Sequence, residues 1–345
     1  MKSLNILFPL LFTLVLSVSC SSDKQEQVPL PTNNTPAVKV DNFSAFDSEF
    51  HNGSKQGSEM SITLPTDHSK YAKIYMYVTL RCATATCPAW DVYANIYVKD
   101  PLTGTFLEMA RYITPYGVDN AKRDRGFRFD VTDFKSLLKG STNLKSYIEC
   151  WTSEGWNLSV DFDFEEGTPD YKYYAVVPVI QVNRLSIEGI PYGTAATYNP
   201  TKNITLPANT EKTHLRTIIS GWGHATPQES GRPCAEWCFK THRIQIDGVN
   251  TFTHSLNPIG CATNPIQPQA GNWSPDRAGW CPGMEVPTRI DVWANAGASS
   301  TKQFKYVFQP WTNDGLASNP NAYYAISTMV VVKSNTAIDK PIITN

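Results

Sequence analysis

Apolar and polar side chains alternate with a period of two residues over many short stretches of this chain. In residues 74–80 every second side chain is aliphatic or Met, and in residues 159–164 Val and Phe alternate with Ser and Asp. This period is typical of strands with one buried face. Similar runs lie at 91–98, 172–182, 214–220, 242–247, 288–294, 304–308 and 323–332. Because turn clusters rich in Gly, Pro, Asn and Asp separate them, we expect an all-β sandwich, jelly roll or barrel.

The sequence contains fewer signals for helices and domain boundaries than for strands. Only residues 133–140 look helical, with Asp133 as the N-cap and Gly140 at the end, over about two turns. The turn cluster at 167–170 predicts a joint between two β domains, 41–168 and 169–345. A length of 345 residues with 41% hydrophobic residues is sufficient for such cores. A formal net charge of −1 without a basic run argues against a nucleic-acid partner.

The first twenty residues indicate export. An apolar run from Ile6 to Val18 follows Met1-Lys2 and is too short to span a bilayer. It ends at Cys20, which resembles the lipidated cysteine of a bacterial lipoprotein, and ordinary signal-peptidase cleavage is the alternative. Residues 21–40 contain three prolines and form a tether in this interpretation. We expect a secreted, periplasmic or outer-membrane-anchored protein.

An exported chain exposes its thiols to oxidising conditions. Eight cysteines are present, and removing Cys20 leaves seven, so one should stay unpaired. Cys150 lies in a strand-like run, where a free thiol behaves as a small buried hydrophobe. The expected disulfides are Cys82–Cys87, Cys234–Cys238 and Cys261–Cys281.

Three carboxylates stand beside tryptophans. An indole can cover the C–H face of a sugar, while an acid takes a hydroxyl or activates a water. Acids that converge among indoles also raise one another's pKa values, which suits acid–base chemistry near neutral pH. The alternative is that each acid is an ordinary loop or strand-end carboxylate. The three pairs are Trp90 with Asp91, Glu149 with Trp151, and Glu236 with Trp237.

Metal binding is a rival interpretation of the cysteines. Cys234, Cys238 and His242 have the residue types of a zinc site, and His224 is near in sequence. Their spacing departs from the usual zinc pairs, and exported cysteines tend to oxidise. We therefore expect no metal and no cofactor, and interpret the two histidines as structural or hydrogen-bonding groups. No signature of a Ser or Cys nucleophile is present.

Several longer segments resemble the bacterial peptide-N-glycosidase F family, whose members are peptide-N4-(N-acetyl-β-glucosaminyl)asparagine amidases. The resemblance extends from about Phe43 to Asn345. The segments that carry it are 90–98, 130–138, 159–163, 167–172, 219–225, 234–239 and 273–284.

The resemblance implies two eight-stranded antiparallel jelly rolls packed side by side, with an active site in the cleft between them. It also implies hydrolysis of the amide of glycosylated Asn in N-linked glycoproteins and glycopeptides, by a monomer without a metal. Asp91 is then the principal catalytic acid, Glu236 holds the attacking water, and Glu149 supports them. The expected substrate contacts are Trp90, Trp151, Trp222, His224, Trp237 and Arg277.

Two departures from the family pattern bear on specificity. Val92 stands where an Arg follows the catalytic Asp, and Gly117 stands where the best-known member has Trp. We interpret both as the loss of substrate-facing bulk or charge, with a shifted glycan or peptide preference. Two other functions remain open: an endoglycosidase using two carboxylates, and a non-catalytic glycan-binding β-sandwich.

Overall fold

The computed structural model describes residues 38–183, 190–191, 200–229, 231–309 and 322–345. The expected export signal, Cys20 and most of the expected tether lie outside the described residues. Val38–Asn345 form one compact unit. The described part contains no helix long and apolar enough to cross a membrane.

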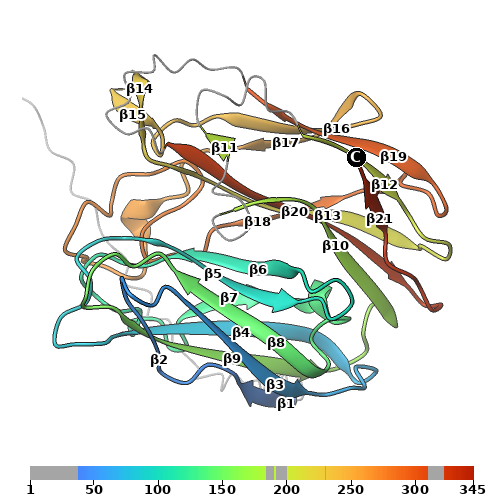
Figure 1. Cartoon of the computed structure of the whole chain (residues 1–345), viewed down its shortest axis with the longest axis horizontal. Coiled ribbons are helices and arrows are strands. Elements are labelled where there is room, and N and C mark those ends of the chain that lie inside the picture. Colours follow the sequence, from blue (N-terminus) through green and yellow to red (C-terminus); the bar gives the residue numbers. More distant parts are fainter. Residues whose placement is uncertain (1–37, 184–189, 192–199, 230, 310–321) are drawn as a thin grey trace, which may run out of the picture. The chain divides into compact units, whose positions relative to one another are not determined.

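The first half of this unit is a sandwich of two antiparallel sheets (Figure 1). One sheet has the order β1-β9-β4-β7, with β2 also on β9, and the other has the order β3-β8-β5-β6. β1 and β2 pair with successive parts of β9, so they act as one interrupted edge strand of an eight-stranded sandwich. The strands are β1 (Val40–Ser44), β2 (Glu49–His51), β3 (Gly57–Leu64), β4 (Tyr71–Cys82), β5 (Tyr93–Lys99), β6 (Phe106–Ile113), β7 (Phe127–Asp130), β8 (Gly140–Ile148) and β9 (Trp156–Glu166).

The second half repeats this architecture. Its inner sheet has the order β10-β20-β13-β18, with β11 on β20, and its outer sheet has the order β17-β16-β19-β12-β21. A separate hairpin pairs β14 with β15. The strands are β10 (Tyr173–Val182), β11 (Ile190–Pro191), β12 (Thr201–Thr205), β13 (Lys212–Trp222), β14 (His224–Glu229), β15 (Arg232–Ala235), β16 (Thr241–Ile246), β17 (Val249–Ser255), β18 (Thr288–Val292), β19 (Thr301–Phe308), β20 (Tyr323–Ser334) and β21 (Ile342–Thr344). The expected all-β, antiparallel two-sandwich fold is confirmed.

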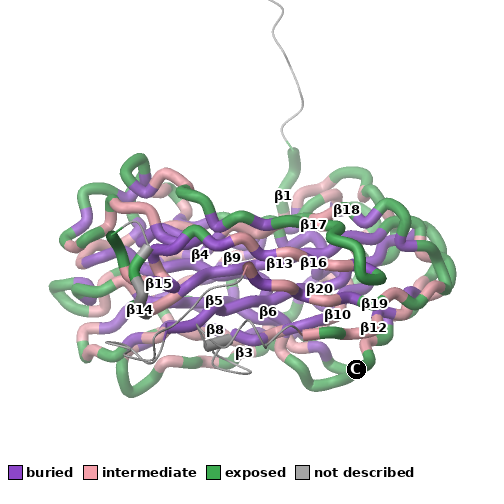
Figure 2. Tube along the Cα trace, turned by 90° about the horizontal axis from the view of Figure 1, so that it is seen from above, coloured by how far each residue is buried: buried purple, intermediate pink, exposed green. Residues whose placement is uncertain are grey.

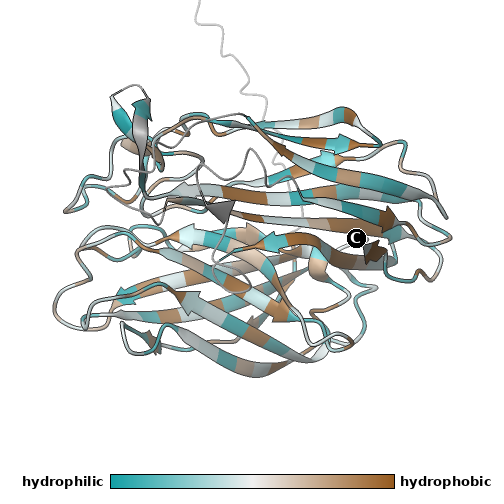
Figure 3. Cartoon of the chain, turned by 45° about the horizontal axis from the view of Figure 1, so that its top comes forward, coloured by the Kyte–Doolittle hydropathy of each residue, from teal (hydrophilic) through white to brown (hydrophobic). Residues whose placement is uncertain are grey.

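Burial explains why the sequence patterns differ between strands. β4 alternates buried and partly exposed residues because one of its faces meets the core. Figure 3 shows hydrophobic and hydrophilic segments following one another along the strands. β20 is buried at every position (Figure 2). Its Met329 and Val331 join the core of the first half, whereas Val330 and Val332 join the core of the second. The inner sheet of the second half therefore packs on both of its faces.

A buried ion pair fixes the two inner sheets against each other. Arg111 on β6 and Glu108 are both essentially without exposed surface, and Arg111 Nη2 lies 2.8 Å from Glu108 Oε2. Arg111 Nη1 donates across the boundary between the two halves, which we call the seam, to Ser220 Oγ at 2.9 Å and to the Ala325 carbonyl at 2.8 Å. A buried pair of this kind is tolerated when hydrogen bonds satisfy its polar atoms. Ser220 also accepts from the indole Nε1 of Trp222 at 3.2 Å, so the seam is connected to the candidate site.

Two local expectations are wrong. Residues 133–140 do not form a two-turn helix, and only a single 3₁₀ turn, η1 (Thr132–Phe134), is present. The carboxylate of Asp133 cannot serve as a helix cap because it lies 2.9 Å from His214 Nε2 and 3.5 Å from Arg216 Nη1. Cys150 is buried as expected, but it follows the end of β8 and does not belong to a strand.

The three expected disulfides are present, and the thiol of Cys150 is free. Non-reducing peptide mapping should therefore return three cross-linked peptide pairs. The Cys150 peptide should be alkylated only after unfolding, because burial raises the pKa of its thiol to about 12 and leaves 2% of the residue exposed. A disulfide that contains Cys150 would contradict this scheme.

Candidate active site

The candidate site is assembled from loops at one end of the two sandwiches. Asp91 and Trp90 lie between the Cys82–Cys87 disulfide and β5, and Glu149 follows β8. Glu236 comes after the hairpin β14–β15, and Arg277 belongs to the long loop before β18. Residues distant in sequence thus meet at the ends of strands whose registers are fixed by the cores.

Glu236 is held by its backbone and by its carboxylate. It lies inside the Cys234–Cys238 ring, its N–H donates to the Gly223 carbonyl at 3.1 Å, and its carbonyl accepts from Ala278 at 2.7 Å. Its side chain is 14% exposed. Arg277 Nε donates to Oε1 at 3.4 Å, and His224 Nε2 lies 3.3 Å from Oε2. The carboxylate therefore points into a fixed polar environment, and its hydrogen bond raises the pKa of His224.

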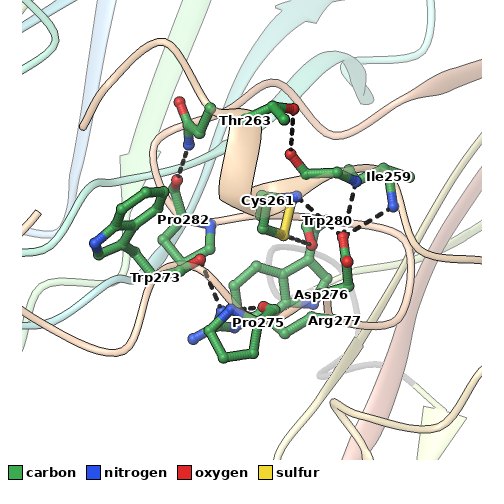
Figure 4. The surroundings of a disulfide bond; sticks show 12 residues. Ile259, Cys261, Thr263, Trp273, Pro275, Asp276, Arg277, Trp280 and Pro282 are labelled. Atoms are coloured by element: carbon green, nitrogen blue, oxygen red, sulfur yellow. Dashed lines mark hydrogen bonds between the residues drawn. A yellow bond between two sulfur atoms is a disulfide. The ribbon is translucent and has the colours of Figure 1, made fainter. Parts of the chain in front are cut away.

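Arg277 is completely buried, and all five of its N–H donors are used. Besides the bond to Glu236, Nη2 donates to Tyr116 Oη at 3.3 Å. Figure 4 shows its bonds to the surrounding loop. The carbonyl acceptors belong to Asn272 at 2.5 Å, Pro275 at 2.7 Å and Trp273 at 3.3 Å. In this geometry every N–H donor of Arg277 is used within the protein, and its expected contact with the substrate stays a prediction.

Asp276 stabilises the same loop from the other side (Figure 4). Its Oδ1 accepts from the backbone N–H groups of Ile259, Gly260 and Cys261, at 3.1, 2.8 and 3.0 Å. The Cys261–Cys281 disulfide encloses this segment. The loop that carries Arg277 is thereby fixed by a carboxylate cap and a covalent bond.

Asp91 has an unusual environment for a carboxylate. Burial raises its pKa from 3.8 to about 6, and the nearby Glu236 adds to this, whereas Tyr116 and Arg277 oppose it. Its Oδ2 atom is enclosed and has no hydrogen-bond partner among the described residues. An enclosed carboxylate oxygen without a partner can accept a proton from a bound ligand or donate a proton to it.

Two indoles are exposed at the site. Trp90 and Trp151 are 51% and 60% exposed, and their ring centroids lie 5.8 Å apart at an angle of 35°. Trp90 also lies 6.4 Å from the ring of Tyr116, which connects this pair to Arg277. Such flat apolar surfaces beside an acid suit a carbohydrate.

The indoles of Trp222 and Trp237, the other two tryptophans expected to contact the substrate, are less exposed to a ligand. Trp222 is partly buried and stacks on Trp280 at 4.2 Å. Trp237 is 8% exposed, with the guanidinium groups of Arg277 and Arg232 over its ring at 4.4 and 4.7 Å. The expectation that Trp237 covers a sugar is therefore not supported by this geometry, because cations occupy the space beside its ring.

Glu149 is placed near this group through the backbone. Its N–H donates to the carbonyl of Tyr93 at 2.9 Å, and the Tyr93 ring meets the edge of Trp222 at 5.8 Å. The structure brings Asp91, Glu236, His224 and Arg277 together through the contacts above. For Glu149 it shows proximity to Tyr93, and its supporting role stays a prediction.

Sequence reasoning missed two residues of the site. Tyr116 contacts Arg277 and influences the pKa of Asp91, and Trp280 forms the support on which Trp222 stacks. Trp280 also donates from Nε1 to the Gly221 carbonyl at 2.7 Å. Both lie in segments rich in aromatic residues beside Pro115 and Cys281, and that is the only signal the sequence offered.

The residues of the alternative zinc site have other partners in the structure. Cys234 and Cys238 are joined to each other, and His242 lies among aromatic rings with Nδ1 2.7 Å from Tyr306 Oη. Burial lowers the pKa of His242 to about 3. The group of potential ligands found among the described residues is Cys261, Asp276 and Cys281, where the cysteines are again a disulfide.

The two family departures lie in different surroundings. Val92 is 7% exposed and belongs to the core of the first half, so its interpretation as a substrate-facing position is wrong. Gly117 has a φ of 62°, and a Cβ built there would lie 2.9 Å from Ala270 Cβ. Val92 therefore belongs to the packing of the core, whereas the effect of Gly117 on substrate preference stays a prediction.

Gly117→Ala should lower the free energy of unfolding by roughly 1–2 kcal/mol, because a side chain disfavours positive φ and would also meet Ala270. Gly104→Ala is the matched control, since Gly104 has a φ of 74° but nothing within 4 Å of its built Cβ. Urea unfolding should give the larger loss for Gly117→Ala. Equal losses would show that the contact with Ala270 contributes nothing.

The fold and the site define a two-sandwich β-protein with paired acids beside exposed indoles, an arrangement suited to a glycan-directed hydrolase. Two family models match, "Peptide-N-glycosidase F, N terminal" over residues 99–164 and "Peptide-N-glycosidase F, C terminal" over residues 191–331. The chain is 53% identical over 326 residues to the peptide-N(4)-(N-acetyl-β-D-glucosaminyl)asparagine amidase F of Elizabethkingia miricola, covering 93% of this chain and 92% of that protein. The chain belongs to the peptide-N-glycosidase F family.

Solved structures agree with this assignment. The structure of PNGase F, a glycosylasparaginase from Flavobacterium meningosepticum, is 54% identical with a TM-score of 0.85, covering 89% of this chain and all of that one. A 2.2 Å structure of the asparagine amidase gives 53% identity, a TM-score of 0.84 and the same coverage. The structure of PNGF-II in a P21 crystal is 15% identical with a TM-score of 0.67, covering 86% of this chain and 66% of that one, and it supports the fold alone.

Proposed function

We infer that this protein is a peptide-N4-(N-acetyl-β-glucosaminyl)asparagine amidase that acts on N-linked glycoproteins and glycopeptides. It hydrolyses the amide between the side chain of Asn and the first GlcNAc, so that the whole glycan leaves and Asn becomes Asp. Family membership supports this activity. The structural observation that carries it is the enclosed, unpartnered Oδ2 of Asp91 close to Glu236 and beside the indole of Trp90.

The proposed reaction needs an acceptor that holds the attacking water and a donor that engages the leaving nitrogen, and it assigns these two roles to two acids. Water attacks the carbonyl carbon of the Asn side chain, and the carbon–nitrogen bond breaks. The nitrogen leaves with the sugar as a glycosylamine, which afterwards loses ammonia in water. In our proposal Glu236 accepts a hydrogen bond from the attacking water, while Asp91 engages the amide nitrogen and the first GlcNAc.

The surroundings of each acid fit its proposed role. Arg277 and His224 face the carboxylate of Glu236 from two sides, which fixes the orientation of its oxygens toward a water in the site. Asp91 has a raised pKa of about 6, which allows a proton to be held and transferred near neutral pH. Trp90 and Trp151 would cover the apolar faces of the chitobiose core. Glu149 is proposed to support these acids.

The released glycan tests the proposal against an endoglycosidase. After incubation with a denatured N-glycoprotein, an amidase releases glycans that carry both core GlcNAc residues at the reducing end. An endoglycosidase cuts between these two residues, and a glycan-binding protein releases nothing. Analysis of the reducing end of the released glycans should find the complete chitobiose.

We also propose export and anchoring through Cys20, with the enzyme acting as a monomer. The apolar run that ends at Cys20 and the proline-containing tether support this location. Cys20→Ala should move the protein from the membrane fraction to the soluble fraction. A wild-type protein that already lies in the soluble fraction would favour cleavage by ordinary signal peptidase.

A further inference from the structure

A second cavity of about 420 Å³ lies at the seam between the two halves. We call it the seam pocket, and its walls come from β4, β7, β13, β18, β20 and the loops beside them. Arg216 of its wall and Trp222 of the candidate site are six residues apart in β13, which corresponds to about 20 Å along the strand. The seam pocket is therefore distinct from the catalytic acids.

Positive charge dominates the wall of the seam pocket. Five lysines and arginines line it together with His214, against the three acids Asp130, Asp133 and Glu285. This excess is local, because the whole chain carries a formal net charge of −1. The basic residues are Lys73, Arg128, Lys212, Arg216 and Lys333.

All three acids are already engaged by cations. Asp130 pairs with Lys73 at 3.0 Å, and Glu285 pairs with Arg123 at 2.5 Å. Asp133 faces three basic groups, which hold the pKa of its carboxyl well below the usual range. These partners are His214 at 2.9 Å, Lys333 at 3.3 Å and Arg216 at 3.5 Å. The acids therefore leave little negative charge for a further cation.

Two basic residues have no acidic partner. Lys212 and Arg128 are exposed and form no ion pair within the described ranges. The guanidinium of Arg128 stacks on the ring of Tyr75 at 3.6 Å and hydrogen-bonds with Tyr77, and these two neutral partners orient it without neutralising its charge. Unpaired cations in one cavity are the usual means of attracting an anion.

Arg216 contributes a buried donor to the wall of the seam pocket. It is 5% exposed and crosses the seam, where Nη2 donates to the carbonyls of Met109 at 3.2 Å and Asp130 at 3.1 Å. Its Nε–H is buried and has no partner among the described residues. Buried donors are nearly always satisfied, so this orphan indicates an acceptor that the chain itself does not supply.

We propose that the seam pocket binds an oxyanion, the carboxylate or phosphate of a small molecule. Lys212 and Arg128 attract the anion at the opening, and Arg216 provides a fixed donor within the wall. The volume exceeds that of a bare phosphate group, and Val286 and Ile290 form apolar walls for the rest of a sugar-sized ligand. The inference does not depend on the proposed amidase activity.

Calorimetric titration of the full protein tests the proposal with three probes at matched ionic strength. They are N-acetylneuraminic acid, glucose 6-phosphate and inorganic phosphate, with glucose as the uncharged control. At least one anion should bind with a stoichiometry of one, and glucose should not bind. Stronger binding of an acidic sugar would identify a sugar-borne anion as the ligand, whereas equal binding of inorganic phosphate would identify the free oxyanion.

The double variant Lys212→Gln/Arg128→Gln should weaken that binding about tenfold or more, because it removes two charged donors. Both side chains are exposed, so folding should be unaffected, and thermal unfolding without ligand checks this. Lys139→Gln is the matched control, because Lys139 is also exposed but lies outside the seam pocket. Absence of binding by all three anions, or binding that the double variant leaves unchanged, would overturn the proposal.

Discussion

Asp91→Asn is expected to lower turnover by roughly 10²–10⁴ while chitobiose still binds with nearly the wild-type affinity. Asn keeps the shape and hydrogen-bonding capacity of Asp, but it cannot ionise or transfer a proton. Glu149→Gln should have a milder effect, because Glu149 is proposed to support the other acids. Steady-state kinetics on a glycopeptide and a separate chitobiose titration measure the two quantities. Near-normal turnover of Asp91→Asn would show that the active site has been placed wrongly.

Asp91→Asn should raise the free energy of unfolding even though it lowers turnover. Burial raises the pKa of Asp91 from 3.8 to about 6, so the folded protein binds this proton more tightly than the unfolded chain does. The stabilising contribution is complete below pH 4 and is lost as the pH rises through 6. Two pKa units correspond to about 3 kcal/mol. Asp91→Asn should therefore be more stable than wild type at pH 8, by up to that amount, and about equally stable at pH 4 in urea unfolding.

Glu236→Gln is expected to reduce turnover by a similar factor of roughly 10²–10⁴, because an amide is a weaker hydrogen-bond acceptor than a carboxylate and holds the attacking water less well. The variant should also lower the pKa of His224, since the hydrogen bond to Glu236 is the main cause of its increase. An NMR titration of the His224 ring measures this second effect. A merely structural loop change would not produce both results together.

Glu59→Gln provides the matched control for Glu236→Gln. Glu59 lies on β3, and its carboxylate pairs with Lys145 at 3.1 Å on the surface. An exposed pair of this kind contributes little to stability. Turnover of Glu59→Gln should equal that of wild type, and a large loss would indicate that any Gln substitution harms this protein.

Much of the fold was predictable because strand periodicity and burial have the same cause. The alternation in residues 74–80 follows from a sheet with one face on the core, and the continuous apolar run of β20 follows from a strand buried on both faces. The small Cys234–Cys238 ring was predictable from the close spacing of its two cysteines. The helix expected at 133–140 failed because Asp133 is engaged by basic residues of the other half, which local sequence cannot reveal.

The proximity of two of the expected acids was predictable, but their surroundings were only partly so. The pairing of an acid with a neighbouring Trp singled out Asp91 and Glu236, which the structure brings near each other, and their catalytic roles stay predictions. Sequence could not show that Trp237 is covered by two guanidinium groups, because these arise from a separate loop and hairpin. Nor could it show that Arg277 has used every donor within the protein. These properties depend on tertiary contacts between segments that the sequence keeps apart.

The most direct test of the amidase activity follows the glycosylated Asn itself. A purified N-glycopeptide is incubated with the enzyme in water enriched in heavy oxygen, and the peptide is sequenced by mass spectrometry. Attack of water on the side-chain carbonyl predicts Asp at the former glycosylation site, with one heavy oxygen in its carboxyl group. A GlcNAc retained on Asn, or an unchanged glycopeptide, would contradict the assignment.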